Sequence, residues 1–235
     1  MSKVKFVYCF IKKLSTNMEQ YTINLQLLEK SIKDLSKHYP YRLITDLETL
    51  DDVKSLTNKI EIVNSDSFIF LDDFKISLIE KLNPDEVIID PDLFVFNKLD
   101  IDLSKAMVFE HKDKPYHSWY KDHIEELKGT LLYDRIKTAG KLPFVPNIGF
   151  FKMSDKKLRA EFLKTYRLYR DDLCNKVTEN RNRFNLLLGQ YLMGIVLYEG
   201  NYSYFYTRGT NTVKVYSHLA GPDKYKKFKL NKPVI

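Results

Sequence analysis

The chain lacks the features that mark several classes of protein. It has only two cysteines, Cys9 and Cys174, so no cysteine cluster is available for a metal, and both thiols are expected to be buried in a reducing interior. No apolar run approaches the roughly 20 residues of a membrane helix. The first residues, MSKVKFVYCFIKK, have no small-residue cleavage site, which favours a core strand over a signal peptide. These absences predict a cytoplasmic protein without a membrane span.

The sequence also lacks internal repeats and low-complexity linkers, and it has only eight glycines and eight prolines. Hydrophobic residues make up 44% of the chain and aromatic residues 14%, which is ample for a core and excludes intrinsic disorder. A chain of 235 residues without a boundary in its composition predicts a single domain over residues 1–235.

The charge of the chain is modestly basic and unevenly distributed. The formal net charge is +7 and the isoelectric point about 9.1. An excess of this size fits nucleotide, phosphate or nucleic-acid partners, although many soluble proteins have it without such a partner. The final segment, GPDKYKKFKLNKPVI, holds five lysines against one aspartate, which predicts a basic C-terminal tail.

Strand-like and helix-like segments alternate along the chain. The predicted strands of the first half are 3–11, 41–45, 59–63, 86–90 and 106–111, with helices at 16–35 (capped by Thr16), 47–56 and 74–82. The second half is predicted to hold helices at 117–139, 158–173 and 184–198, and strands at 147–153, 202–206 and 213–218. This order predicts an α/β fold, a mostly parallel central sheet flanked by helices, with ligands beyond the carboxyl ends of the strands.

Two carboxylates, Asp90 and Asp92, interrupt an apolar stretch at the end of the predicted strand 86–90. A buried unpaired aspartate costs several kcal/mol, about 2–7, and two close together also repel each other. A divalent cation with oxygen ligands and open positions for phosphate resolves both costs. The alternative is ordinary Asp-Pro-Asp turn chemistry. A phosphatase of the haloacid dehalogenase type is set aside, because its pair ends the first strand and is closely followed by threonine.

The C-terminal part offers a second group of candidates. His218 follows an apolar strand, and an imidazole is a competent ligand for Mn²⁺. Gly221 permits close backbone approach to a ligand, and Lys224 can meet a phosphate as a point charge. The alternative is a strand followed by a Gly-Pro turn and a solvated basic tail.

Together, Asp90-x-Asp92 and His218-x-x-Gly221-x-x-Lys224 resemble two motifs of GT-A fold glycosyltransferases, most closely the glycogenin-like and lipopolysaccharide galactosyltransferase-like family. That family has Asp-x-Asp after a strand and His-x-x-Gly-x-x-Lys-Pro-Trp near its end. Here Tyr-Lys stands in place of Pro-Trp, so the second match is partial. The resemblance implies a Rossmann-like GT-A domain with Mn²⁺ or Mg²⁺ held by Asp90, Asp92 and His218, and with Lys224 on the diphosphate of the nucleotide.

The resemblance implies further roles for residues that the motifs do not contain. Lys75 stands where the family has a basic residue that meets the nucleotide-sugar, and Asn147 and Gly149 stand in its Asn-x-Gly turn at the donor sugar. The first strand of such a domain ends over the nucleobase, so Tyr8, Phe10 or the loop at 12–13 is expected to touch it. Each has a structural alternative: a solvated helix lysine, a plain turn, or core residues of a strand.

One position departs from the family. An acidic residue followed by glutamine stands near the reacting sugar carbon in the family, whereas this chain has Gly189-Gln190. Gln190 is expected to contact the sugar, or else to be an inward polar residue of a buried helix. An inverting enzyme needs a carboxylate base, for which Asp122, Asp134 and Glu179 are candidates, while the resemblance favours retention.

We therefore predict a metal-dependent glycosyltransferase that transfers a sugar from a nucleotide-sugar, a UDP-sugar, to an acceptor hydroxyl. Residues 1–110 are expected to form the nucleotide-binding half, and residues 111–235 the half for sugar and acceptor, which completes the metal site. A nucleotidyltransferase is the first alternative, but the loop after the first strand has no glycine. A nucleic-acid-binding protein with stacking tyrosines is the second. A viral glycosyltransferase acting on modified DNA in the host cytoplasm combines the two ideas.

Overall fold

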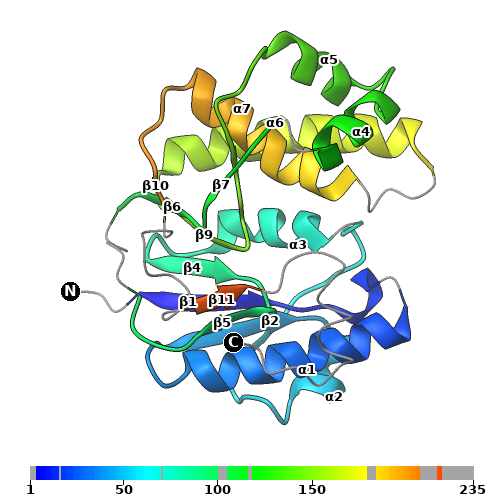
Figure 1. Cartoon of the computed structure of the whole chain (residues 1–235). Coiled ribbons are helices and arrows are strands. Elements are labelled where there is room, and N and C mark those ends of the chain that lie inside the picture. Colours follow the sequence, from blue (N-terminus) through cyan, green and yellow to red (C-terminus); the bar gives the residue numbers. More distant parts are fainter. Residues whose placement is uncertain are drawn as a thin grey trace.

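The protein is a layered α/β structure, seen here in a computed structural model (Figure 1). The structure describes residues 4–15, 17–69, 71–99, 105–115, 118–178, 184–206 and 216–218, the last of these as backbone. Helices α1 and α2 cover one face of the central sheet, and α3 with the group α4–α7 covers the other (Figure 1). The predicted α/β fold, a mostly parallel sheet flanked by helices, is confirmed.

The central sheet has seven strands in the order β10-β6-β9-β4-β1-β2-β3. Pairs β1–β2, β1–β4, β2–β3 and β6–β10 are parallel, and β9 alone runs antiparallel to both of its neighbours. The strands are β1 (Lys5–Cys9), β2 (Tyr41–Thr45), β3 (Ile60–Ile62), β4 (Glu86–Ile89), β6 (Met107–Phe109), β9 (Phe150–Met153) and β10 (Phe205–Tyr206). Since β9 lies between β4 and β6, both halves of the chain contribute to one sheet.

Two small antiparallel pairs stand outside this sheet. One joins β5 (Leu93–Val95) to β11 (Tyr216–His218), and the other joins β7 (Lys112–Asp113) to β8 (Val145–Pro146). The residues of β5 belong to the apolar run after Asp92, which the periodicity of the sequence did not identify as a strand. Its pairing partner comes from the end of the described chain, about 120 residues later, so no local pattern could indicate it.

Most helices agree with the predicted ranges to within a few residues, but the predicted helix 117–139 is two helices, because Gly129 takes a positive φ and Thr130 caps a new helix. They are α1 (Met18–Leu35), α2 (Leu47–Val53), α3 (Leu71–Leu78), α4 (Ser118–Glu126), α5 (Leu131–Thr138), α6 (Lys156–Lys176) and α7 (Leu192–Glu199), with short helices η1 (Lys12–Leu14), η2 (Ile79–Lys81) and the π-turn η4 (Leu187–Tyr191). The side chain of Asn17 caps α1 by accepting a hydrogen bond from the Gln20 amide, one residue after the predicted cap. In the part of the chain that the structure describes, no helix has the length and apolar character to span a bilayer.

Alternation along the central strands gives each face of the sheet its own core cluster. Phe6 and Tyr8 of β1 pack with α1, whereas Val7 and Cys9 pack with the opposite cluster, which contains residues of α3, α6 and α7. In a strand, successive side chains point to opposite faces. Ile88 of β4 belongs to the cluster on the α3 side of the sheet, so the side chain of Asp90, two positions later, is expected on that side as well.

The strand order identifies a candidate ligand-binding position at the carboxyl ends of β1 and β4. Strands β2 and β3 lie on one side of β1, whereas β4 lies on the other. The order in which successive strands are added to the sheet therefore reverses at β1, although β1 and β4 are parallel. The crevice beyond the carboxyl ends of such a pair is where open α/β sheets bind ligands. Asp90 directly follows β4 at this switch point.

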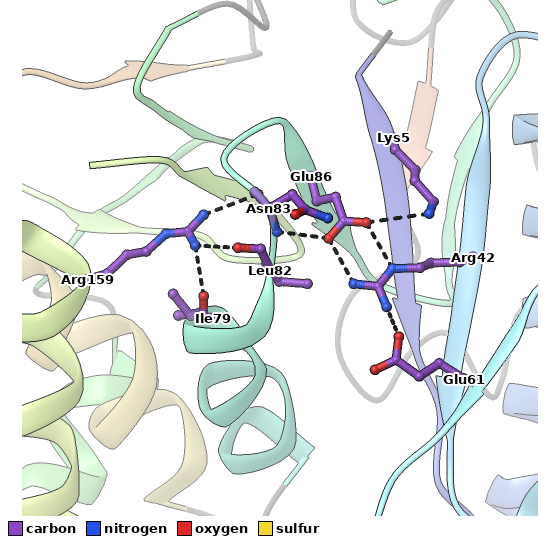
Figure 2. A network of polar contacts seen from close by, with 8 residues as sticks. All are labelled: Lys5, Arg42, Glu61, Ile79, Leu82, Asn83, Glu86 and Arg159. Atoms are coloured by element: carbon purple, nitrogen blue, oxygen red, sulfur yellow. Dashed lines mark hydrogen bonds and ion pairs between the residues drawn. The ribbon is translucent and has the colours of Figure 1, made fainter. Parts of the chain in front are cut away.

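The opposite end of the α3–β4 segment is fixed by a polar network (Figure 2). Glu86 is 2% exposed and accepts two hydrogen bonds from Arg42, at 2.9 and 2.8 Å, and one from the Asn83 amide at 3.0 Å. From the other side, Arg159 of α6 donates to the carbonyls of Ile79, Leu82 and Asn83. These contacts satisfy the free carbonyls at the end of η2 and hold α3 and β4 in a fixed relation.

Candidate functional site

The side chains of Lys75 and Asp90 meet at the switch point. The Lys75 ammonium lies 2.7 Å from Asp90 Oδ1 and 3.0 Å from Asp72 Oδ1. Asp72 and Lys75 are three residues apart on α3 and so share a face of the helix. Asp90 directly follows β4, and its side chain lies on the face of the sheet that α3 covers. The three side chains are 4%, 4% and 17% exposed, so water screens the contacts little.

The charge state of this cluster follows from its composition. Burial alone lowers the pKa of Lys75, but the nearby charges of Asp72 and Asp90 outweigh it and raise that pKa above its ordinary value. Lys75 is thus a permanent ammonium that lies against two carboxyl groups. Asp72 stands in the first turn of α3, where the positive end of the helix dipole favours a carboxylate.

Asp90 and Asp92 flank a tight turn between β4 and β5. The Leu93 amide donates to the Asp90 carbonyl at 3.2 Å, and Asp92 is 4% exposed. The backbone of His218 pairs with Leu93 in the antiparallel ladder of β5 and β11. His218 therefore stands on a neighbouring strand, one residue in register from Asp92, although the two are more than 120 residues apart in sequence.

Carboxylates with an imidazole form a donor set that suits Mn²⁺ or Mg²⁺. Among the side chains that the structure describes, no group of three His, Cys, Asp or Glu is arranged for a metal. The side chain of His218 is not one of them. The backbone register places His218 on the strand beside the two carboxylates, and the three residues as ligands of one ion stay a prediction.

The Asn147–Gly149 turn adjoins the same point. The Gly149 carbonyl accepts a hydrogen bond of 2.6 Å from the Asp90 amide, and the Gly149 amide donates to Asn147 Oδ1 at 2.9 Å. The side-chain amide of Asn147 in turn lies 3.4 Å from Asp113 Oδ2. The turn before β9 thus connects the Asp-x-Asp segment to a further carboxylate.

Asp113 is the centre of a second polar cluster after β6. Its carboxylate accepts from Asn147, from the Tyr120 hydroxyl at 3.5 Å and from His111 Nε2 at 3.1 Å. His111 lies between Asp113 and Glu110, the latter 0% exposed and 3.4 Å from Nδ1. Burial lowers the pKa of His111, but the hydrogen bond to Asp113 and the ion pair with Glu110 raise that pKa to about 9, so the ring is charged at neutral pH.

Gln190 lies in the π-turn η4, a type of helix irregularity that is common at functional sites. It is 6% exposed, and its Oε1 accepts a hydrogen bond of 3.0 Å from Tyr120, which also contacts Asp113. A Cβ atom at the preceding Gly189 would stand 3.0 Å from Asp72 Oδ2. Through Tyr120 on one side and Asp72 on the other, η4 joins the two polar clusters.

The structure thus brings together five predicted residues, Lys75, Asp90, Asn147, Gly149 and Gln190, with Asp92 in the same turn. Tyr8 does not belong to this group. It is 0% exposed, and its hydroxyl bonds to Ser31 of α1 at 2.7 Å, because strand alternation directs it to the α1 face. Tyr8 is therefore a core residue, in place of the predicted nucleobase contact.

Other predicted residues lie elsewhere. Phe10 is in the core on the α1 side, and Lys13 of η1 donates to the Ser65 carbonyl beyond β3. Asp122 and Asp134 are exposed on α4 and α5. Gly221, Lys224 and Glu179 lie outside the residues that the structure describes.

Two acidic residues of the site were not identified from the sequence. Asp72 precedes Lys75 by three residues in the first turn of a helix, a spacing that indicates an ion pair. Asp113 belongs to the polar run 110–114, which directly follows a strand, the position where ligands bind in this class of sheet. Both signals were present in the sequence, but neither belongs to a motif.

No protein-family model matches the sequence, and no curated protein matches it. Among solved structures, the crystal structure of the galactosyltransferase LgtC in complex with donor and acceptor sugar analogs is similar. Its TM-score is 0.46 and its sequence identity 15%, over 93% of this chain and 87% of the LgtC chain. A likeness of this degree does not establish a shared activity.

Proposed function

We propose that the protein is a metal-dependent glycosyltransferase of the GT-A type that uses a nucleotide-sugar, a UDP-sugar, as donor. The observation that supports it best is the turn Asp90–Asp92 at the switch point of the sheet, with Lys75 against Asp90 and the backbone of His218 in register beside the turn. Open α/β sheets bind their ligands at such a switch point. Acidic residues there fit a cation that accompanies a diphosphate.

Asp90, Asp92 and His218 would hold Mn²⁺ or Mg²⁺. When bound, such an ion supplies positive charge that neutralises the diphosphate leaving group. Lys75 adds a buried ammonium next to Asp90, and Gly221 and Lys224 are proposed to contact the diphosphate. Gly149 fixes the Asp90 backbone through its carbonyl, which holds the turn in place for the ligand.

The sugar and the acceptor hydroxyl are assigned to the second cluster. Asn147, Gln190 and Asp113 offer an amide donor, an amide acceptor and a carboxylate, the groups that recognise sugar hydroxyls. Tyr120 connects Asp113 and Gln190 and so keeps their spacing. The resemblance predicts that the anomeric configuration of the sugar is retained. The anomeric configuration of the product tests this prediction.

A thermal-shift panel of UDP, GDP and UDP-sugars, each with and without Mn²⁺, tests the proposal. A ligand at about 100 times its dissociation constant stabilises the folded state by about 2.7 kcal/mol. We expect a shift with UDP and Mn²⁺ together, and metal-dependent hydrolysis of a UDP-sugar that Asp92→Asn abolishes. Asp51→Asn, at an exposed carboxylate of α2, is the matched control.

The same experiment separates the alternatives. The absence of a shift with every nucleotide, with or without Mn²⁺, would rule the proposal out. A nucleic-acid-binding protein would instead bind single-stranded DNA in a salt-dependent manner, and Asp92→Asn would not weaken that binding. A nucleotidyltransferase would consume a nucleoside triphosphate and release pyrophosphate.

A further inference from the structure

We propose that Lys75 is an internal counter-ion that occupies Asp90 in the absence of a divalent cation, and that Asp72 is the acceptor to which its ammonium turns when the cation binds. This inference rests on the proposed function, because it concerns the same metal site. It begins from the position of Lys75, whose Nζ lies between Asp90 Oδ1 at 2.7 Å and Asp72 Oδ1 at 3.0 Å.

The first step is competition for one carboxylate. Asp90 is 17% exposed in its side chain and needs a compensating charge, which Lys75 provides at hydrogen-bond distance. A divalent cation on the same carboxylate would lie within a few ångströms of the ammonium. Two positive charges at such a distance in a site that water screens little repel each other. Lys75 therefore opposes the binding of the cation unless its ammonium withdraws.

The second step is the place to which the ammonium withdraws. Asp72 is 3% exposed and already accepts from Lys75 through Oδ1. Its other oxygen, Oδ2, is buried and has no hydrogen-bond partner among the described residues. A buried carboxylate oxygen without a partner is unusual, since nearly all such atoms are satisfied. Asp72 thus has unused acceptor capacity next to the ammonium.

The third step is the space around Asp72. Its Oδ2 faces Gly189 of η4, at a distance of 3.0 Å from the position of a Cβ. Any other residue at position 189 would crowd the carboxylate. Glycine leaves Asp72 room to adjust when Lys75 turns toward it, and it couples this adjustment to the π-turn that contains Gln190.

A consequence is that free Mn²⁺ binds more weakly than the carboxylates would otherwise allow. The cation is then retained mainly together with the diphosphate, whose negative charge compensates both the cation and the ammonium. Lys75 acts on the cation through charge and does not need to contact it.

The test uses Mn²⁺ alone as the probe, with free Mn²⁺ measured by electron paramagnetic resonance on the full chain. Lys75→Met removes the competing charge, and we expect the dissociation constant for Mn²⁺ to fall by about tenfold or more. Asp72→Asn keeps the size of the side chain but removes the charge that attracts Lys75 away from Asp90. We expect this variant to bind Mn²⁺ more weakly, by about tenfold. A merely structural role of the pair would move both variants in the same direction.

Control variants separate effects on folding from effects on Mn²⁺ binding. Lys54→Met removes the lysine of an exposed pair with the same three-residue spacing, Asp51 and Lys54 at 2.7 Å, and should leave Mn²⁺ binding unchanged. The double variant Lys75→Met/Asp72→Asn removes both buried charges, and we expect it to bind Mn²⁺ as tightly as Lys75→Met. Circular dichroism and melting temperature verify the fold of each variant.

The outcomes distinguish this inference from the proposed function. If the wild type binds UDP with Mn²⁺, but neither Lys75→Met nor the double variant binds Mn²⁺ more tightly than the wild type, the internal counter-ion is disproved and the proposed function stands. If the wild type and all variants bind no Mn²⁺, with or without UDP, both are overturned. Opposite shifts in the two single variants support the inference.

Discussion

Gly189 lies directly against the carboxylate of Asp72. A Cβ built on Gly189 would stand 3.0 Å from Asp72 Oδ2 and 3.4 Å from Ile76 Cδ1. Real Cβ atoms rarely approach an oxygen so closely, so η4 and α3 touch at a point where there is no room for a side chain. The resemblance implies an acidic residue at position 189, where this chain has glycine. The carboxylate of Asp72, from α3, lies against that position.

Gly189→Ala is expected to destabilise the protein by about 1–3 kcal/mol, as is usual for overpacking in a filled core. In a helix interior without such a neighbour, the same change would stabilise by about 0.5–1 kcal/mol. The sign of the change in the free energy of unfolding, measured by urea denaturation, therefore reports the contact with Asp72.

A double-mutant cycle isolates this contact. In an Asp72→Ala background the carboxylate is gone, and Gly189→Ala should then be neutral or stabilising. Equal destabilisation by Gly189→Ala in both backgrounds would show that the crowding comes from another neighbour.

The second prediction concerns the network of Figure 2. Glu86 is buried, and Glu86→Gln removes the charge that two hydrogen bonds from Arg42 engage. We expect a loss of about 2–3 kcal/mol in the free energy of unfolding. Glu80→Gln, in an exposed pair with Arg167, should cost less than about 1 kcal/mol and serves as the control.

The same carboxylate predicts a response to acid. Burial raises the pKa of Glu86, but the bonds from Arg42 and the Asn83 amide outweigh it and bring that pKa below its ordinary value of 4.5. The contribution of Glu86 to stability is therefore present above pH 4.5 and is lost as the pH falls through the pKa of the folded state. Glu86→Gln should lose less stability than the wild type over this acid range. Identical acid profiles for both proteins would contradict this assignment.

Local patterns predicted much of this fold, because they depend on residues close in sequence. The runs that became β1, β2, β3 and β4, and the helices between them, follow from periodicity, and Asp90 fell at the end of β4 as expected. The pairing of β5 with β11 did not follow, because it joins residues more than 120 positions apart. The place of β9 between β4 and β6 likewise depends on the whole sheet.

Predictions for the candidate site succeeded or failed for a similar reason. Lys75 and Asp90 were both named from the sequence, but not their contact, which needs α3 to lie over β4. Tyr8 was expected at the nucleobase, although alternation along β1 sends its side chain toward α1. Asp113 belongs to no motif, and its contacts with Asn147 and Tyr120 form only in the folded chain, so its position after β6 was not enough to identify it.

The third prediction is that Asp113→Asn impairs turnover of the nucleotide-sugar. The change removes the charge that His111 and Tyr120 face, and so loosens the geometry of Asn147 and Gln190. Misplacement of positioning groups costs about tenfold to a hundredfold in rate. Steady-state kinetics with a UDP-sugar should show this loss in kcat/KM.

A matched control is Asp122→Asn, which changes an exposed aspartate of α4. The melting temperature of Asp113→Asn is expected to stay within a few degrees of the wild type, because its side chain is 31% exposed. An unchanged kcat/KM in Asp113→Asn would remove this cluster from the sugar site.

The last prediction is a loss of stability at alkaline pH that originates from His111. Its pKa is raised from 6.5 to about 9 in the folded state, since the hydrogen bond to Asp113 and the ion pair with Glu110 outweigh the effect of burial. Between these two pH values the folded protein binds a proton that the unfolded chain has released. The contribution of His111 is therefore complete below pH 6.5, declines as the pH rises, and is lost above about pH 9.

Chemical denaturation at a series of pH values tests this sign. The free energy of unfolding of the wild type should fall between pH 6.5 and 9, and His111→Asn should remove most of that slope. The neighbouring Tyr120 does not confuse the measurement, because burial and the charge of Asp113 raise its pKa above the ordinary value of 10.0, outside this window. The ring resonances of His111, followed by nuclear magnetic resonance, locate the proton directly. A midpoint near 6.5 would show that Glu110 and Asp113 do not hold the imidazolium, and that the cluster around Asp113 lacks the positive charge assigned to it.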